Sequence, residues 1–109
     1  LRWLLDGCSA LLEAHQVLGE IALGDNDLPL ARSHFGFAYE LGLNALGHGF
    51  SGLLPYARPT NQPFLEAGKG LAWTLKQLGE PQLAAEVVQR LLTFDLADPL
   101  GLEKILHDS

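Results

Sequence analysis

The amino-acid sequence predicts an all-α fold of antiparallel helix pairs, with about five helices. Three observations lead to this prediction. Apolar residues recur at alternating steps of three and four, Gly, Asn and Pro separate these periodic segments, and the pattern repeats after a constant interval. With 109 residues, 48% of them hydrophobic, the chain is long enough to bury a core and too apolar for disorder. We therefore expect one domain over residues 1–109.

The first helix is predicted over residues 1–22. Its apolar or small residues follow the helical period at Leu4, Cys8, Leu11, His15, Leu18 and Ala22. Asp6 could instead cap a fresh start, so a break near this residue stays open as an alternative. The helix should stop within residues 23–27, where Gly and Asn tolerate a left-handed backbone and Asp27 can cap the next helix.

The second helix is predicted over residues 28–41, with Pro29 in its first turn and Gly42 as its end. Residues 42–62 then combine a high density of helix-breaking Gly and Pro with four apolar side chains, Phe50, Leu53, Leu54 and Tyr56. We expect this segment to be a long connector docked on the helices.

Helix signals return after the connector. Thr60 or Asn61 before Pro63 predicts a third helix over residues 64–78, with Gly79 as its stop. Pro81 then opens a fourth helix that runs to about residue 94. Asp98-Pro99 predicts the cap and start of a last helix, which ends near residue 107.

An internal repeat relates the first two helices to the third and fourth. Small residues permit the paired helices to approach closely, and larger ones fill the next layer. Corresponding positions lie 53 residues apart: Leu18, Ala22, Asn26, Ala31 and Phe35 match Leu71, Leu75, Gly79, Ala84 and Val88, with Gly19 and Ala72 as further small residues.

These residues resemble the tetratricopeptide repeat family over residues 12–98. The resemblance implies a short right-handed superhelix, with repeat one at 12–45, an inserted connector at 46–64, repeat two at 65–98 and a C-terminal helix at 99–109. The family pattern has Trp where this chain has His15 and Gly68, and its closing Pro is replaced by Leu43. We therefore expect His15 in the core.

The C-terminal half has a second similarity. It is similar to bacterial proteins related to the suppressor of tumorigenicity 7 group, through Glu66-Ala67, Gly70-Leu71-Ala72, Leu78-Gly79, Leu91-Leu92, Asp98-Pro99 and Gly101.

The tetratricopeptide resemblance implies a concave groove for peptides, lined by the first helix of each repeat. The residues implied are Glu13, Gln16, Glu20 and Leu23 from repeat one and Glu66, Lys69, Trp73 and Lys76 from repeat two. Family members that grip a terminal carboxylate present Lys and Asn where this chain has Gln16 and Glu20, so we do not expect that mode. Lys69, Trp73 and Lys76 share one helical face that suits an acidic or extended peptide. The alternative is a solvated face on which Trp73 packs against the connector.

We expect a non-catalytic protein-interaction or scaffold module with a protein or peptide partner. The alternative is an accessory or regulatory domain of a larger enzyme whose catalytic part lies in another sequence, and the start at Leu1 in place of Met suggests a fragment or a trimmed chain. We also consider a homo-oligomer, because two repeats are fewer than the three or so that usually close such a core. The apolar end formed by Leu1, Trp3 and Leu4 also favours a homo-oligomer.

The composition of the chain disfavours several other classes of function. The net charge of −6 and the absence of a basic cluster disfavour nucleic acid and anionic membranes as partners. No apolar run has the length of a membrane span, and the single Cys8, expected to be a small buried residue, favours the cytoplasm. Among the four histidines only His15 and His34, with Glu13, could converge, so we expect no metal or cofactor. Gly47-His48-Gly49 lacks the Lys-Ser/Thr of a phosphate-binding loop.

Overall fold

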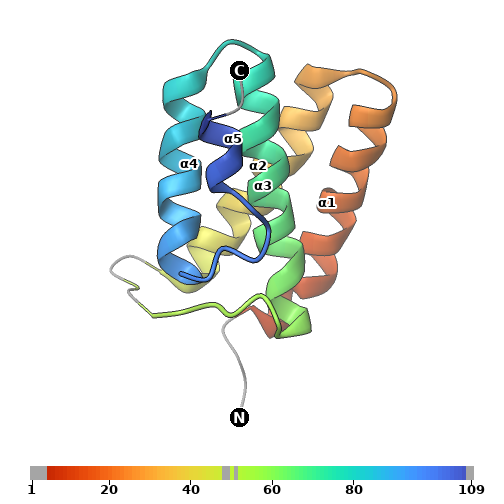
Figure 1. Ribbon diagram of the computed structural model, residues 1–109. Coiled ribbons are helices and arrows are strands. Elements are labelled where there is room, and N and C mark those ends of the chain that lie inside the picture. The colour runs from red at the N-terminus through yellow and green to blue at the C-terminus, as the bar shows by residue number, and fades with distance from the viewer. Residues whose placement is uncertain (1–4, 48–49, 51, 108–109) are drawn as a thin grey trace.

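The structure is a computed structural model that describes residues 5–47, 50 and 52–107 (Figure 1). Five α-helices and two short 3-10 turns follow one another in this part of the chain, which confirms the all-α prediction. Their bounds are η1 Asp6–Cys8, α1 Ser9–Gly24, α2 Leu28–Leu46, η2 Pro59–Asn61, α3 Gln62–Gln77, α4 Pro81–Phe94 and α5 Glu103–His107.

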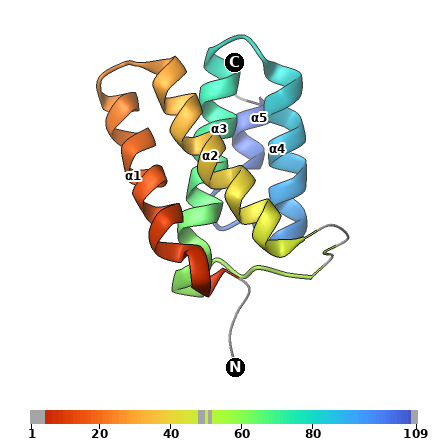
Figure 2. The ribbon, with the colours of Figure 1, turned by 180° about the vertical axis from the view of Figure 1, so that it is seen from behind.

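The first four helices pack in sequence. Each contacts the next one along the chain, and α1 also contacts α3. The short α5 packs on α4 and lies in front of α3 and α4 in Figure 1. Seen from behind in Figure 2, α2 and α4 lie side by side in front of α3 and run in the same direction. None of the helices in the described residues is long and apolar enough to cross a membrane.

The N-terminal helix differs from its prediction in two ways. The chain forms the 3-10 turn η1 before α1 begins at Ser9, and the N-cap residues are Leu5 and Cys8, so Asp6 is not the cap that the alternative supposed. The buried side of α1 consists of Leu12, Gly19 and Ala22, whereas Leu11 and Leu18 are 46% and 42% exposed. The predicted burial of these two leucines is therefore wrong. The side of α1 that faces α2 and α3 is shifted by one residue from the predicted side. The first residue of the predicted stripe, Leu4, lies outside the described residues.

The turn between α1 and α2 follows the sequence prediction. Asn26 has the left-handed φ of 58°. The Asp27 carboxylate accepts a hydrogen bond from the Leu30 backbone N–H at 3.2 Å, which satisfies one of the free donors at the start of α2.

The predicted end of the second helix at Gly42 is wrong, because α2 continues to Leu46. Gly42 is buried in the middle of the helix, and a Cβ placed there would collide with the ring of Phe64. Its function is close approach between α2 and α3, and Gly47, with a φ of +85°, ends the helix instead.

The connector is docked, as predicted. The Leu54 N–H donates to the Phe94 carbonyl at 2.8 Å, and the Tyr56 N–H donates to the Asp95 carboxylate at 2.9 Å. Leu54 is buried, but Leu53, also expected to pack, is 60% exposed.

The C-terminal half matches its predictions except at the last helix. Gly79 stops α3 with a φ of +82°, and α4 has the predicted bounds. The last helix begins at Glu103 and not at Pro99. Asp98 has a φ of +51°, and its carboxylate accepts hydrogen bonds from the N–H groups of Leu102 at 2.7 Å and Glu103 at 3.2 Å, so it caps a turn that precedes α5.

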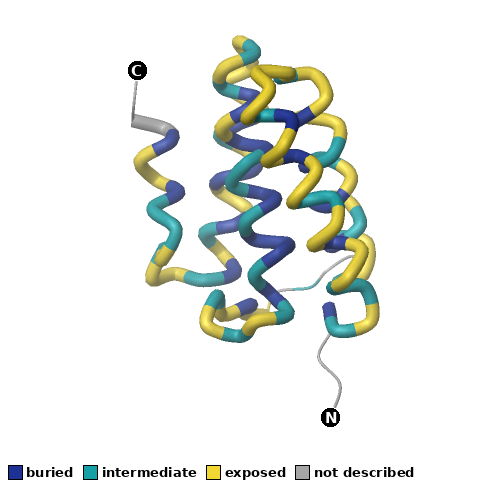
Figure 3. The backbone as a smooth tube through the Cα atoms, turned by 90° about the vertical axis from the view of Figure 1, so that its right-hand side faces the viewer, coloured by how far each residue is buried: buried dark blue, intermediate teal, exposed yellow. Residues whose placement is uncertain are grey.

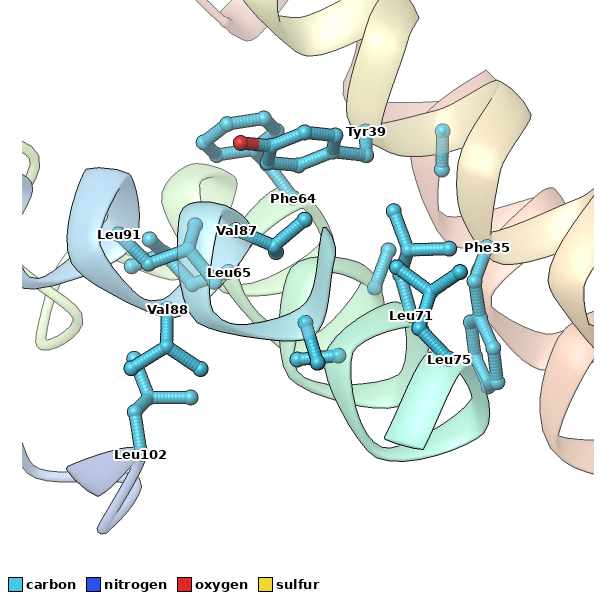
Figure 4. Packing of buried hydrophobic residues seen from close by; sticks show 14 of the residues in the cluster. Phe35, Tyr39, Phe64, Leu65, Leu71, Leu75, Val87, Val88, Leu91 and Leu102 are labelled. Carbon is cyan, nitrogen blue, oxygen red and sulfur yellow. The ribbon is translucent and has the colours of Figure 1, made fainter. Parts of the chain in front are cut away.

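Phe35 is the central side chain of the first core layer. Its ring lies between α1 and α3, since a Cβ at either Gly19 or Gly70 would come within 2.6 Å of it. Figure 4 shows the ring next to Leu71 and Leu75 of α3. The small residues expected at helix contacts, Gly19, Ala31, Ala72 and Ala84, are all buried.

A second layer follows toward the C-terminus. The Tyr39 and Phe64 rings stack with centroids 5.7 Å apart, and Val88 of α4 points toward Leu102 of the C-terminal segment (Figure 4). The core is thus continuous from the first helix pair to the second.

Candidate functional site

The residues predicted on α1 lie on its surface. Glu13 and Glu20 are exposed and Gln16 is half-buried. The Gln16 amide donates to the Glu20 carboxylate at 2.7 Å, so these two side chains are linked within the helix. Leu23 is half-buried and packs against the core.

Two of the residues predicted on α3 bind other parts of the chain. Glu66 accepts a hydrogen bond from the Tyr56 hydroxyl of the connector at 2.5 Å. This hydrogen bond, together with burial, raises the pKa of Tyr56 to about 12. Lys76 donates to the Ile105 carbonyl of α5 at 2.6 Å. The connector and α5 therefore occupy part of the predicted peptide-binding face.

Lys69 and Trp73 lie between these two contacts on α3. Lys69 is half-buried, and the Trp73 ring is 43% exposed. We refer to these residues of α3, together with the predicted residues of α1, as the α1–α3 side, and partner binding by this side stays a prediction.

A pronounced cleft lies on the opposite side, between α2 and α4. It encloses about 1280 Å³. Leu71 and Leu75 of α3 form its floor, and Leu46, Gly47 and Phe50 line the end where α2 passes into the connector. The cleft exists because α2 and α4 both rest on α3 and hardly touch each other. We call this cleft the α2–α4 groove.

The rim of the groove carries charges of both signs. Arg32 and Glu40 come from α2, and Glu86 and Arg90 come from α4; all four are exposed. Their charges cancel, although the whole chain has a net charge of −6. The groove therefore suits an occupant of mixed charge better than a strongly charged one.

Tyr39 is the most buried titratable residue in the groove wall, at 6% exposure. Burial is the main reason that its pKa rises to about 12; Arg90 lowers the pKa, whereas Glu40 and Glu86 raise it. The hydroxyl thus keeps its proton at neutral pH and can donate or accept a hydrogen bond.

The lining of the groove is chemically mixed. It combines aliphatic and aromatic side chains with a polar rim. In the described residues, no three or more His, Cys, Asp or Glu side chains gather into a group that could hold a metal ion. His15 and His34 do converge, as the sequence allowed, but on the far side of α2 from the groove, with their Nδ1 atoms 3.1 Å apart. His15 is half-buried there and not in the core; its ring lies against the rings of His34 and Phe37.

The sequence analysis missed the groove residues. A signal was present in α2, where small and apolar residues on one side, Ala31, Phe35 and Ala38, are accompanied by Gly36, Tyr39 and Leu43 on another. A helix with two apolar sides indicates two contacts.

Comparisons with known proteins returned no match. No protein-family model, no curated protein and no solved structure matches this chain.

Proposed function

We propose that this chain is a non-catalytic protein-interaction module that binds an amphipathic helix of a partner protein in the α2–α4 groove. The observation that supports the proposal is the cleft between two helices that share one floor, with apolar side chains at its base and polar ones at its rim. Residues 32–46 of α2 border it over roughly 21 Å at 1.5 Å per residue, which is about four turns of a helix. An amphipathic helix in an apolar groove is a common mode of recognition.

We also propose a tetratricopeptide-like stack for the fold, in which α1–α2 and α3–α4 are the two repeats. The contact of α1 with α3 as well as α2 supports this proposal. So does the burial of equivalent residues 53 positions apart, such as Ala31 and Ala84 or Phe35 and Val88. With Cys8 as the only cysteine of the sequence, we place the protein in the cytoplasm.

The test uses Gly36, which lies in the groove wall. A Cβ there would meet only Leu71, at 3.9 Å, so a side chain at this position fits the fold and projects into the groove. Gly36→Gln should therefore block a partner helix without unfolding the chain. Gly24→Gln, at the exposed end of α1 where a Cβ meets nothing within 4 Å, is the matched control.

The experiment captures partners with the parent chain, identifies them, and measures their affinity for each variant by calorimetry. We expect Gly36→Gln to weaken binding at least tenfold and Gly24→Gln to leave it unchanged. Loss of binding with Trp73→Ala or Lys69→Glu, but not with Gly36→Gln, would instead assign the partner to the α1–α3 side. Equal binding by all variants would contradict both assignments.

A further inference from the structure

The side of the α1–α2 pair that is remote from α3 is apolar and exposed. We call it the outer face and define it by six residues, Leu11, His15 and Leu18 of α1 and Leu30, His34 and Phe37 of α2. The three leucines and Phe37 are 42–49% exposed, and none of the six is an acidic or strongly basic residue. Figure 3 views the molecule from the α1 side and shows exposed positions along the helices there.

The internal repeat shows what kind of surface the outer face is. Its α1 residues Leu11 and Leu18 correspond to Phe64 and Leu71 of α3, 53 positions later. Phe64 and Leu71 are buried, because the α1–α2 pair covers that side of α3. The outer face is therefore a helix-packing surface by sequence, and in the described part of the chain no helix covers it.

The exposed area of the outer face is too small by itself for a stable contact between two copies of the chain. The exposed parts of its side chains amount to on the order of 400 Å² per copy, and two copies together to roughly 800 Å², below the usual size of a specific interface. A contact between two copies needs an additional link.

His15 and His34 offer that link at the centre of the face. Their Nδ1 atoms are 3.1 Å apart, and the Phe37 ring lies 4.2 Å from the His15 ring. Two nitrogen ligands of a tetrahedral zinc ion, at about 2.0–2.1 Å from the metal, lie about 3.3 Å from each other. The two nitrogens are thus already at about the separation that one shared zinc ion requires.

We propose that two copies of this chain meet through their outer faces and that the His15 and His34 pairs of both copies hold one zinc ion between them. Each copy supplies two ligands, and two copies complete the four of a closed zinc site. Without zinc, one Nδ1 carries the proton of the hydrogen bond. When zinc binds, that proton moves to Nε2 of the same ring, so each imidazole stays neutral.

The net charge opposes contact between two copies unless a cation lies between them. Each copy has a net charge of −6, so two copies repel each other. A divalent cation at the centre offsets part of this repulsion, and the leucines and Phe37 around it exclude water from the ligands.

The test is sedimentation velocity of the 11.8 kDa chain at about 50 μM, with EDTA or with zinc chloride. We expect a monomer in EDTA and a species of twice the mass with zinc, saturating at one zinc ion per two chains by calorimetry. A monomer at every zinc concentration overturns the proposal, as does a dimer of equal strength in EDTA.

Variants separate the ligands from the apolar contact. His34→Ala should abolish zinc-dependent dimers while the circular dichroism of the zinc-free chain stays that of the parent. Leu18→Glu should also prevent dimers, although both ligands remain. Trp73→Glu places a charge at another exposed apolar residue and should leave the dimer intact. Zinc-dependent dimers of undiminished strength in His34→Ala would show that other residues bind the ion and would overturn the assignment.

Discussion

At the scale of single residues, two side chains connect parts of the molecule that are distant in sequence. Phe35 of α2 fills the space left by glycines on α1 and on α3. Tyr56 of the connector binds Glu66 of α3. The first contact depends on the shape of the glycine positions and the second on the charge of the carboxylate, so each leads to a testable prediction.

Phe35→Ala should lower the free energy of unfolding by about 3 to 5 kcal/mol, because a buried aromatic ring is lost and a cavity remains between three helices. Urea denaturation followed by circular dichroism measures this change. Leu96→Ala, at a side chain that is 78% exposed, is the control and should have little effect. A loss below about 1 kcal/mol for Phe35→Ala would contradict its place in the core.

The two tyrosines of the chain, Tyr39 and Tyr56, should ionise late. Each has a pKa raised to about 12 in the folded protein, against 10.0 ordinarily. The folded state therefore holds these protons more tightly, and the stability that they contribute is complete below pH 10 and is lost as the pH rises toward 12.

Ultraviolet absorbance of tyrosinate measures this titration. In denaturant, both residues should titrate near pH 10. Glu66→Ala removes the acceptor of the Tyr56 hydrogen bond, so one of the two tyrosines should then ionise earlier in the folded protein. A titration identical in the folded and unfolded chains would contradict the buried environments.

At the scale of secondary structure, local chemistry determined which boundaries could be predicted. The cap at Asp27, the stop at Gly79 and the start at Pro81 depend on residues within one turn, and all three are as predicted. Gly42 was wrongly predicted to end α2, because the side chain that requires a glycine there belongs to Phe64, 22 positions away. The prediction for the exposed side of α1 was wrong for a similar reason. Periodicity shows that a helix has apolar sides, but it does not show which of them a neighbouring helix covers.

The two glycines inside α2 should respond oppositely to alanine. Gly36→Ala should stabilise the protein by up to about 1 kcal/mol, because alanine favours the helix and its Cβ has room. Gly42→Ala should destabilise by about 1 to 3 kcal/mol, because its Cβ collides with Phe64. Urea denaturation of the pair measures both, and effects of the same sign would contradict the packing described for α2.

At the scale of the whole molecule, the core is shared between the helix pairs. The sequence predicted the helices, since these follow from periodicity and spacing. It did not predict the α2–α4 groove, because the groove depends on the separation of two helices that are not neighbours in sequence and rest on a third.

The shared core predicts that the first helix pair does not fold alone. A peptide of residues 5–47 lacks α3, and thus both Gly70 and the leucines that enclose Phe35. Its circular dichroism should show little helix in water, since short helices are marginal without tertiary packing. The complete chain under the same conditions is the control, and a cooperative thermal transition of the peptide would contradict this prediction.

The position of α2 has a consequence for regulation. One side of this helix carries His34 and Phe37 of the outer face, and another carries Gly36 and Glu40 of the groove. Residues that are neighbours on this one helix therefore belong to two separate surfaces. If an occupant of either surface displaces α2, it changes the affinity of the other surface, and thermodynamic linkage requires the reverse effect to be equal in size. The helix thus connects the two surfaces for which binding is proposed.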